Sequence, residues 1–145
     1  PFMPTLKKVT LEWLGNLKFV GKNENGLTVN FDVPVDKGGE GTAPSPMETL
    51  LACLAACSSI DVVLLLKKKR QDIRGLIVEV SGLRRDEDPK IYTNISLKYI
   101  VRGVNLNKDY VENAIRLSFE KYCSVGGMLK KAAEITTSYE IIEES

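Results

Sequence analysis

The sequence predicts an α+β domain, because strand and helix patterns follow one another in separate groups rather than alternating. Three strand patterns come first and are followed by one long apolar helix pattern, two further strands, two helical segments and a last strand. At 145 residues the chain is long enough to form one domain with its own core, spanning 1–145. We expect antiparallel strands arranged around a buried central helix.

The N-terminal third predicts a meander of three strands. Residues 9–13 alternate apolar and polar side chains, and 17–20 follow a Gly15-Asn16 turn. The Asn-Gly pair at the end of 23–26 is favoured in tight hairpins, and 27–33 alternate again.

A loop rich in glycine and proline occupies 34–45. It resembles a phosphate cradle only superficially, because no Gly-Lys-Ser/Thr follows the glycines. A plain connecting loop is the better interpretation.

The central helix is predicted over 46–70, the longest apolar run of the chain. Ser45 at the N-cap, Pro46 at the first helical position and Glu48 three residues after the serine are typical of a helix start. Nearly every side of the helix is apolar over 50–66, so we expect it to be covered all round. One sheet of a domain this size cannot supply that cover, and we therefore expect a homodimer.

The second half predicts two long strands, two helices and a closing strand. The expected strands are 76–83 and 91–101, joined by a charged turn at 84–90, and one face of the second strand carries Ile91, Thr93, Ile95, Leu97, Tyr99 and Val101. The next element is a helix capped by Asn107, with Tyr110, Val111, Ala114, Ile115, Ser118 and Tyr122 at helical spacing. A short helix at 128–133 follows a break at Gly126-Gly127, and a strand at 135–142 comes last.

Composition excludes several function classes. The formal net charge is +1, which gives no electrostatic case for nucleic acid or an acidic membrane. The chain has no histidine, so Ser/His/Asp and Cys/His catalysis and histidine-containing zinc sites are excluded. We expect no membrane-spanning segment, because Asp61 interrupts the best candidate, and no signal peptide in the first eight residues. Free thiols in the cytoplasm are the expected state of the 3 cysteines.

The residues able to carry chemistry are thiols and acids, and each has a structural alternative. Cys53 and Cys57 lie one turn apart in the central helix, where cysteine usually packs in the core. Cys123 lies where a helix ends, and a following helix would direct amides towards its sulfur. Glu48 either caps the helix or serves a site, and Asp61 either forms an internal salt bridge or lines a site beside Cys57.

Two cysteine motifs resemble the OsmC/Ohr family. They are Ala43-Pro-Ser-Pro-Met-Glu-Thr-Leu-Leu-Ala-Cys-Leu-Ala-Ala-Cys57-Ser-Ser-Ile-Asp-Val-Val63 and, far downstream, Glu120-Lys-Tyr-Cys123-Ser-Val. The resemblance covers nearly the whole chain. It implies an intertwined α+β homodimer with two cysteines per subunit near the dimer interface.

The resemblance also implies a peroxiredoxin-type thiol peroxidase that reduces organic hydroperoxides or hydrogen peroxide, with an antioxidant role in the stress response. Cys57 would attack the peroxide and become a sulfenic acid, Cys123 would resolve it as a disulfide, and an external dithiol would regenerate both thiols. Glu48 is the candidate acidic residue of the site. No cofactor, metal, nucleic acid or membrane is implied, and Cys53 is assigned to the core.

Two features depart from the active peroxidases of the family. Those enzymes stabilise the thiolate with an arginine from the N-terminal strands, whereas this chain has no arginine before Arg70. They also place a glutamate ten residues before the first cysteine, where this chain has Met47, with Glu48 one residue later. The Met47-Glu48 pair and the Ile60-Asp-Val-Val63 after Cys57 resemble the uncharacterised branch of the family. Lys18 or a lysine of a partner subunit is the candidate replacement for the arginine.

Three hypotheses follow for function. The first is a thiol peroxidase acting through Cys57 and Cys123. The second is a non-catalytic dimer of the same fold that binds a small apolar molecule, with cysteines that only pack. The third is a redox sensor in which a Cys57–Cys123 disulfide changes shape for a partner.

Overall fold

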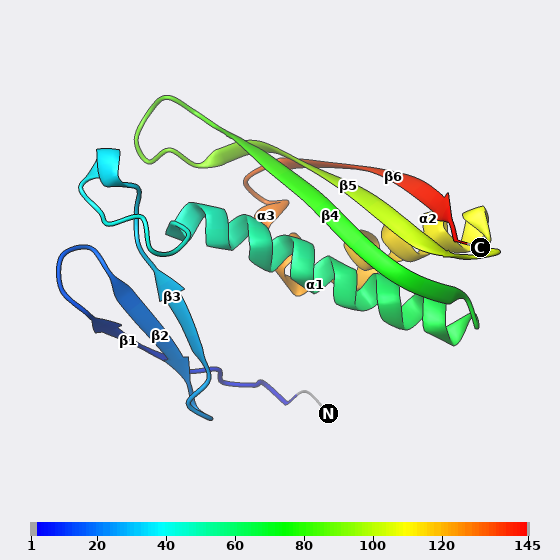
Figure 1. Cartoon of the computed structure of the whole chain (residues 1–145), viewed down its shortest axis with the longest axis horizontal. Coiled ribbons are helices and arrows are strands. Elements are labelled where there is room, and N and C mark those ends of the chain that lie inside the picture. The colour runs from blue at the N-terminus through cyan, green and yellow to red at the C-terminus, as the bar shows by residue number, and fades with distance from the viewer. Residues whose placement is uncertain (1–2, 145) are drawn as a thin grey trace. The chain divides into compact units, whose positions relative to one another are not determined.

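The computed structural model describes residues 3–144 and has the predicted α+β composition (Figure 1). The chain divides into two compact units, Pro1–Leu50 and Leu51–Ser145, which are described separately below. The elements of the described residues are β1 (Val9–Trp13), β2 (Phe19–Asn23), β3 (Thr28–Phe31), a short 3₁₀ turn (Val35–Lys37), α1 (Pro46–Lys68), β4 (Asp72–Arg84), β5 (Tyr92–Val104), α2 (Lys108–Leu117), a π-helical turn (Ser118–Tyr122), α3 (Ser124–Leu129) and β6 (Glu134–Glu143).

The first unit contains the predicted meander, an antiparallel sheet in the order β1-β2-β3. Gly15 and Asn16 adopt the left-handed conformation that the first tight turn requires, with φ of 97° and 48°. In the second turn, the Asn23 side chain accepts hydrogen bonds from the amides of Asn25 and Leu27 at 3.0 and 2.9 Å. These short-range contacts explain why the turns could be predicted from the sequence.

The glycine-rich loop is organised around a carboxylate of the chain itself. Asp32 is buried, and its oxygens accept hydrogen bonds from the amides of Val33, Glu40 and Thr42 and from the Thr42 hydroxyl at 2.6 Å. The Thr42 hydroxyl and amide, with the other two amides, lower the pKa of Asp32 to about 2 although burial opposes this. The inward-pointing amides of the loop already have an anion, which supports its interpretation as a connecting loop.

The second unit contains a mixed sheet in the order β4-β5-β6. β4 and β5 are antiparallel, with Val80 opposite Leu97, but β6 runs parallel to β5, with Thr137 opposite the same Leu97. The expectation of antiparallel strands throughout is therefore wrong at β6. The reason is the connection: α2, the π-helical turn and α3 carry the chain back along the sheet between β5 and β6, which is the kind of crossover that parallel pairing needs.

One face of this sheet and the helices that cover it form the core (Figure 1). The predicted inward face of β5 is confirmed for its four central positions, and one side of α1 and one side of α2 are buried as well. The buried residues are Ile95, Leu97, Tyr99 and Val101 from β5, Leu54, Ser58, Val62 and Leu66 from α1, and Val111, Ala114 and Ile115 from α2.

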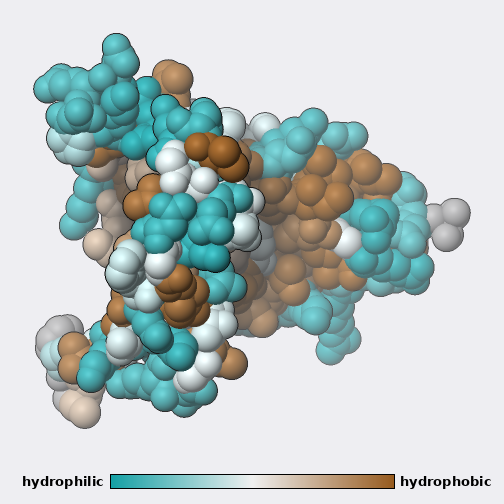
Figure 2. All heavy atoms as spheres, turned by 60° about the vertical axis from the view of Figure 1, so that its left-hand side comes forward, coloured by the Kyte–Doolittle hydropathy of each residue, from teal (hydrophilic) through white to brown (hydrophobic). Residues whose placement is uncertain are grey.

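The single chain covers only one side of α1, so the predicted all-round cover of this helix stays a prediction that requires a second subunit. Its buried residues recur every fourth position and therefore form one narrow line along the helix. Ile60 and Leu64 on another side are 61% and 62% exposed, and Cys53, expected in the core, is exposed too. Figure 2 shows apolar side chains gathered at the surface of the molecule. The second unit by itself has too few elements to enclose an apolar helix of this length.

By length and composition, α1 would also be able to cross a membrane, so the expectation that Asp61 excludes this is wrong. The core helix of a soluble protein passes the same test. The test therefore does not distinguish a membrane span from a helix covered by other protein.

The helical segment after β5 differs from the prediction at its end. Asn107 caps α2 as predicted, with its side chain accepting hydrogen bonds from the amides of Asp109 and Tyr110. The predicted break at Gly126-Gly127 does not occur, because both glycines lie inside α3. A Cβ on Gly126 would lie 3.1 Å from the Phe119 ring, so this glycine permits close packing rather than a turn.

Candidate functional site

Cys57 and Asp61 lie one helical turn apart on α1, beside its buried line. Both are half-buried, and Ser58 between them is fully buried. The helical spacing therefore places a thiol and a carboxyl on the same side of α1, at the border of the core.

Cys123 occupies the junction between the π-helical turn and α3. Its extended backbone, with φ −71° and ψ 104°, separates the two helical segments, and its side chain caps α3. The Gly126 amide donates a hydrogen bond to Cys123 Sγ over 3.3 Å. This confirms the prediction that a following helix would direct an amide towards the sulfur. The side chain is only 5% exposed.

The fold brings the two predicted cysteines together. Both are free thiols, and they are close enough for Cys57 to affect the pKa of Cys123. Burial raises the pKa of Cys123 to about 11, against the effect of the Gly126 amide, and its neighbours Cys57 and Asp61 raise it further. The Cys123 thiol therefore stays protonated at neutral pH.

The contacts of Asp61 decide between the two roles that the sequence left open, an internal salt bridge or a place beside Cys57. No ion pair of Asp61 is found in the part of the chain that the structure describes; instead, its Oδ2 accepts a hydrogen bond from Ser118 Oγ at 3.0 Å. Asp61 thus lines the cysteine site as a hydrogen-bonded carboxylate rather than as half of an internal salt bridge.

Three hydroxyl residues at the site were not predicted as functional. Ser118 Oγ lies 2.9 Å from Ser58 Oγ, which lies 2.5 Å from the Tyr99 hydroxyl, and all three side chains are fully buried. The sequence signal was the presence of serine on two otherwise apolar helix faces, since a buried hydroxyl needs a partner. The identity of each partner depends on contacts between α1, β5 and the turn after α2, which no local pattern encodes.

Glu48 has the capping role that the sequence offered as its structural alternative. Its Oε1 accepts a hydrogen bond from the Ser45 amide at 3.0 Å, and its own amide donates to Ser45 Oγ at 3.3 Å. The hydrogen bonds from Ser45 lower the pKa of Glu48, so the side chain is an exposed, ionised cap. Lys18, the candidate replacement for the missing arginine, forms an ion pair with Glu40 over 3.6 Å.

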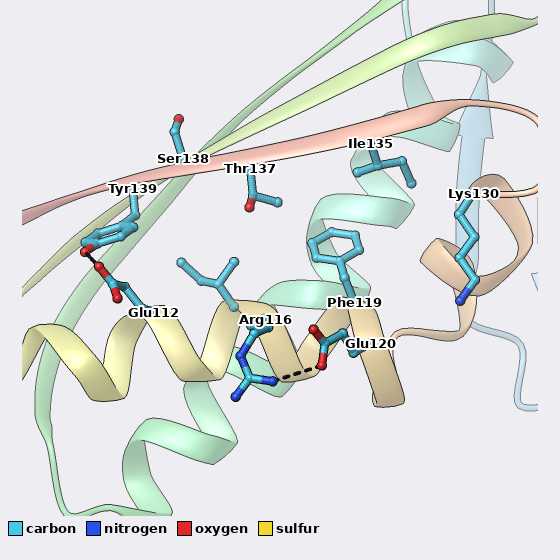
Figure 3. A pocket seen from close by; sticks show the side chains of 10 residues that line it. Glu112, Arg116, Phe119, Glu120, Lys130, Ile135, Thr137, Ser138 and Tyr139 are labelled. Atoms are coloured by element: carbon cyan, nitrogen blue, oxygen red, sulfur yellow. Dashed lines mark hydrogen bonds and ion pairs between the residues drawn. The ribbon is translucent and has the colours of Figure 1, made fainter.

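A groove of the second unit lies away from the cysteines, between α2 and β6 (Figure 3). It has a volume of about 790 Å³, and Ile115, Phe119 and Ile135 give it an apolar lining. Figure 3 shows Tyr139 of β6 hydrogen-bonded to Glu112 at one end of the groove, and Arg116 paired with Glu120. Neither cysteine of the pair lines it.

No cluster of three or more His, Cys, Asp or Glu side chains able to hold a metal occurs among residues 3–144. The chemistry that the described site itself offers is that of two thiols, one carboxylate and three buried hydroxyls.

Comparison with known proteins identifies relatives over nearly the whole chain. The family model described as OsmC-like protein matches residues 39–138. Protein YhfA of Escherichia coli K12 is 43% identical over 133 residues, which are 91% of this chain and 96% of that protein.

Solved structures share the fold. A hypothetical protein from Aquifex aeolicus VF5 is 34% identical, with a TM-score of 0.86 over 98% of this chain and 100% of that one. An organic hydroperoxide resistance protein OsmC from Legionella pneumophila is 16% identical, with a TM-score of 0.71 over 96% of this chain and 99% of that one. At that identity the second likeness is one of fold.

Proposed function

Because this chain belongs to the OsmC-like protein family, we propose that it is a thiol peroxidase in which Cys57 reacts with the peroxide and Cys123 resolves the product. The observation that carries the proposal is that the turn leading to Cys123 packs on α1 beside Cys57: Ser118 Oγ lies 2.9 Å from Ser58 Oγ, and Cys57 affects the pKa of Cys123. The name of the Legionella pneumophila structure, an organic hydroperoxide resistance protein, favours an organic hydroperoxide as substrate.

The environments of the two thiols support this division of roles. Cys57 is half-buried and thus open to a small molecule, whereas Cys123 is buried and held as a thiol. The Cys57 thiolate attacks the terminal peroxide oxygen, the O–O bond breaks, and the alkoxide takes a proton from water and leaves as an alcohol. Cys123 sulfur then attacks the Cys57 sulfenic acid, the S–S bond forms, and hydroxide leaves with the Cys123 proton as water. An external dithiol reduces the disulfide.

Mass spectrometry after one equivalent of cumene hydroperoxide tests the proposal. We expect a Cys57–Cys123 disulfide in the parent protein, and a sulfenic acid on Cys57 that dimedone traps in Cys123→Ser. Cys57→Ser should abolish turnover with a dithiol, while the matched control Cys53→Ser retains it, because Cys53 is exposed and outside the pair. Thiols that stay reduced, or unchanged turnover in Cys57→Ser, would refute the proposal. Disulfide formation without dithiol turnover would favour the redox sensor.

We also propose that the protein is a homodimer located in the cytoplasm. Ile60 and Leu64 on α1, and separately Val9, Leu11 and Trp13 on β1, are each more than half exposed in the single chain. Exposed apolar surface on this scale is a feature of interaction sites. Sedimentation equilibrium should give twice the mass of 16.1 kDa, and Leu64→Glu should shift the protein towards monomer. A monomeric parent protein would contradict this proposal.

The groove between α2 and β6 favours a second candidate function, the binding of a small molecule with an apolar part. A volume of about 790 Å³ is within the usual range of ligand sites. This function requires no thiol chemistry, so ligand binding that persists in Cys57→Ser and is lost in Phe119→Asp would support it.

A further inference from the structure

The groove between α2 and β6 is formed where the helices cover the inner face of β5 but leave the same face of β6 open. The two strands are parallel and in register, so their inner-face residues lie side by side in pairs. In three of these pairs the β5 residue is at most 1% exposed, whereas the β6 residue is half-buried or exposed. The pairs are Ile95–Ile135, Leu97–Thr137 and Tyr99–Tyr139.

The charged side chains along the groove leave one cation available. Glu112 accepts a hydrogen bond from the Tyr139 hydroxyl. Glu120 forms an ion pair with Arg116 over 2.9 Å. Figure 3 shows Lys130 at the opposite end of the groove from Tyr139, and within the described residues its ammonium group has no ion pair. An anionic group of a ligand would therefore find its partner at Lys130.

The Phe119 ring connects the groove to the sulfur of Cys123. Figure 3 shows this ring between the helical segment and β6, where it lines the groove. A Cβ on Gly126 would lie 3.1 Å from the Phe119 ring and 3.2 Å from Cys123 Sγ, so ring and sulfur are both packed against Gly126. The Gly126 amide also donates its hydrogen bond to this sulfur over 3.3 Å. A ligand that touches the ring is thus separated from Cys123 by one residue.

We propose that the groove binds a small carboxylate with an apolar tail, and that its binding slows reaction at Cys123. The carboxylate pairs with Lys130, and the tail covers the apolar lining of Ile115, Phe119 and Ile135. This ligand class deepens the binding function proposed above for the groove and rests on it.

The effect on Cys123 follows from its burial. The side chain is only 5% exposed, so a reagent reaches the sulfur only when its contact with Gly126 loosens. A tail seated on Phe119 holds the ring against Gly126 and opposes this loosening. Because coupling between two sites is reciprocal, a protein already modified at Cys123 should bind the carboxylate more weakly.

Isothermal titration calorimetry with octanoate and its uncharged analogue octanol tests the ligand class. Octanoate should bind the parent protein several-fold more tightly than octanol, and Lys130→Met should abolish this preference. The matched control is Lys131→Met, an exposed neighbour that does not line the groove and should keep it. Equal affinities in the parent protein, or a preference that survives in Lys130→Met, would overturn the carboxylate assignment. Binding of octanol alone would leave the groove its proposed function and overturn only the ligand class.

Alkylation of Cys123 tests the coupling without any peroxide. In a Cys53→Ser/Cys57→Ser protein Cys123 is the single thiol, and saturating octanoate should slow its reaction with iodoacetamide several-fold. Adding Phe119→Leu keeps an apolar lining but removes the ring, so octanoate at saturation should no longer slow the reaction. An alkylation rate that octanoate leaves unchanged would overturn the coupling, as would full slowing in Phe119→Leu. The peroxidase function fails separately, through the absence of a Cys57–Cys123 disulfide after peroxide.

Discussion

The two adjacent glycines of α3 provide a matched pair of substitutions with opposite expected effects. Neither glycine has a positive φ, so alanine fits the backbone at both positions. A Cβ on Gly127 meets nothing within 4 Å. A Cβ on Gly126 lies 3.1 Å from the Phe119 ring and 3.2 Å from Cys123 Sγ, closer than ordinary van der Waals contact.

The helical gain and the packing cost of the new methyl group together decide whether each variant is more or less stable than the parent protein. Alanine is favoured over glycine inside a helix by about 1 kcal/mol, so Gly127→Ala should raise Tm by about 2–4 °C. Gly126→Ala has the same helical gain, but its neighbours must move by a few tenths of an ångström, and overpacking in a core typically costs about 1–3 kcal/mol. The packing cost outweighs the gain, so Gly126→Ala should lower Tm.

Thermal unfolding followed by circular dichroism measures both effects. Disulfide formation after one equivalent of cumene hydroperoxide should also slow in Gly126→Ala, because the new methyl group displaces Cys123 Sγ, and should be unchanged in Gly127→Ala. The reasoning is refuted if Gly126→Ala stabilises the protein as much as Gly127→Ala does. It is equally refuted if Gly127→Ala slows disulfide formation more than Gly126→Ala does.

Three further predictions concern individual hydrogen bonds. Tyr99→Phe removes a buried hydroxyl and should lower the free energy of unfolding in urea by about 1 kcal/mol, whereas Tyr122→Phe at a half-exposed position should be neutral; equal effects would contradict the buried hydrogen bond from Tyr99 to Ser58. The pKa of Asp32 is lowered from its ordinary value of 3.8 to about 2, so its carboxylate stabilises the fold above pH 3.8, and this stability is lost as the pH falls through about 2. Asp32→Ala should therefore flatten the loss of stability on acidification, and an unaltered pH profile would argue against this. Glu48→Gln keeps an oxygen for the Ser45 amide and should preserve both stability and peroxide turnover, while loss of turnover alone would assign Glu48 to the reaction.

The sequence predicted the features that short-range chemistry determines. Asn107 was recognisable as a cap, Asn16 and Gly26 as turn residues, and Ser45 with Glu48 as a helix start, because each acts on a backbone group within a few residues. Sequence patterns of this kind do not fix the direction of a strand. The parallel pairing of β6 depends on the route of the whole segment between it and β5, and for that reason it was missed.

Part of the site was predictable for a different reason. Cys57 and Cys123 were singled out as nucleophiles in two motifs, and the fold brings the two thiols close enough for Cys57 to affect the pKa of Cys123. Cys53, in the same helix, was expected to be buried because every side of that helix is apolar, but one chain covers only one line of it. Apolar residue types on a helix predict that a face will be covered; they do not say by which molecule.

The three buried hydroxyls beside the cysteines show the limit of prediction most clearly. Ser58, Tyr99 and Ser118 come from three separate elements, and each has an ordinary local interpretation: a small residue in a helix, an aromatic in a strand and a polar residue in a turn. What they share is that their hydroxyls are hydrogen-bonded to one another, and these hydrogen bonds form only when α1, β5 and the turn after α2 are packed together. A sequence-based search finds the nucleophiles of such a site, since thiols are rare and distinctive. The buried hydroxyls beside them are common residue types, and their hydrogen bonds are found only in the folded chain.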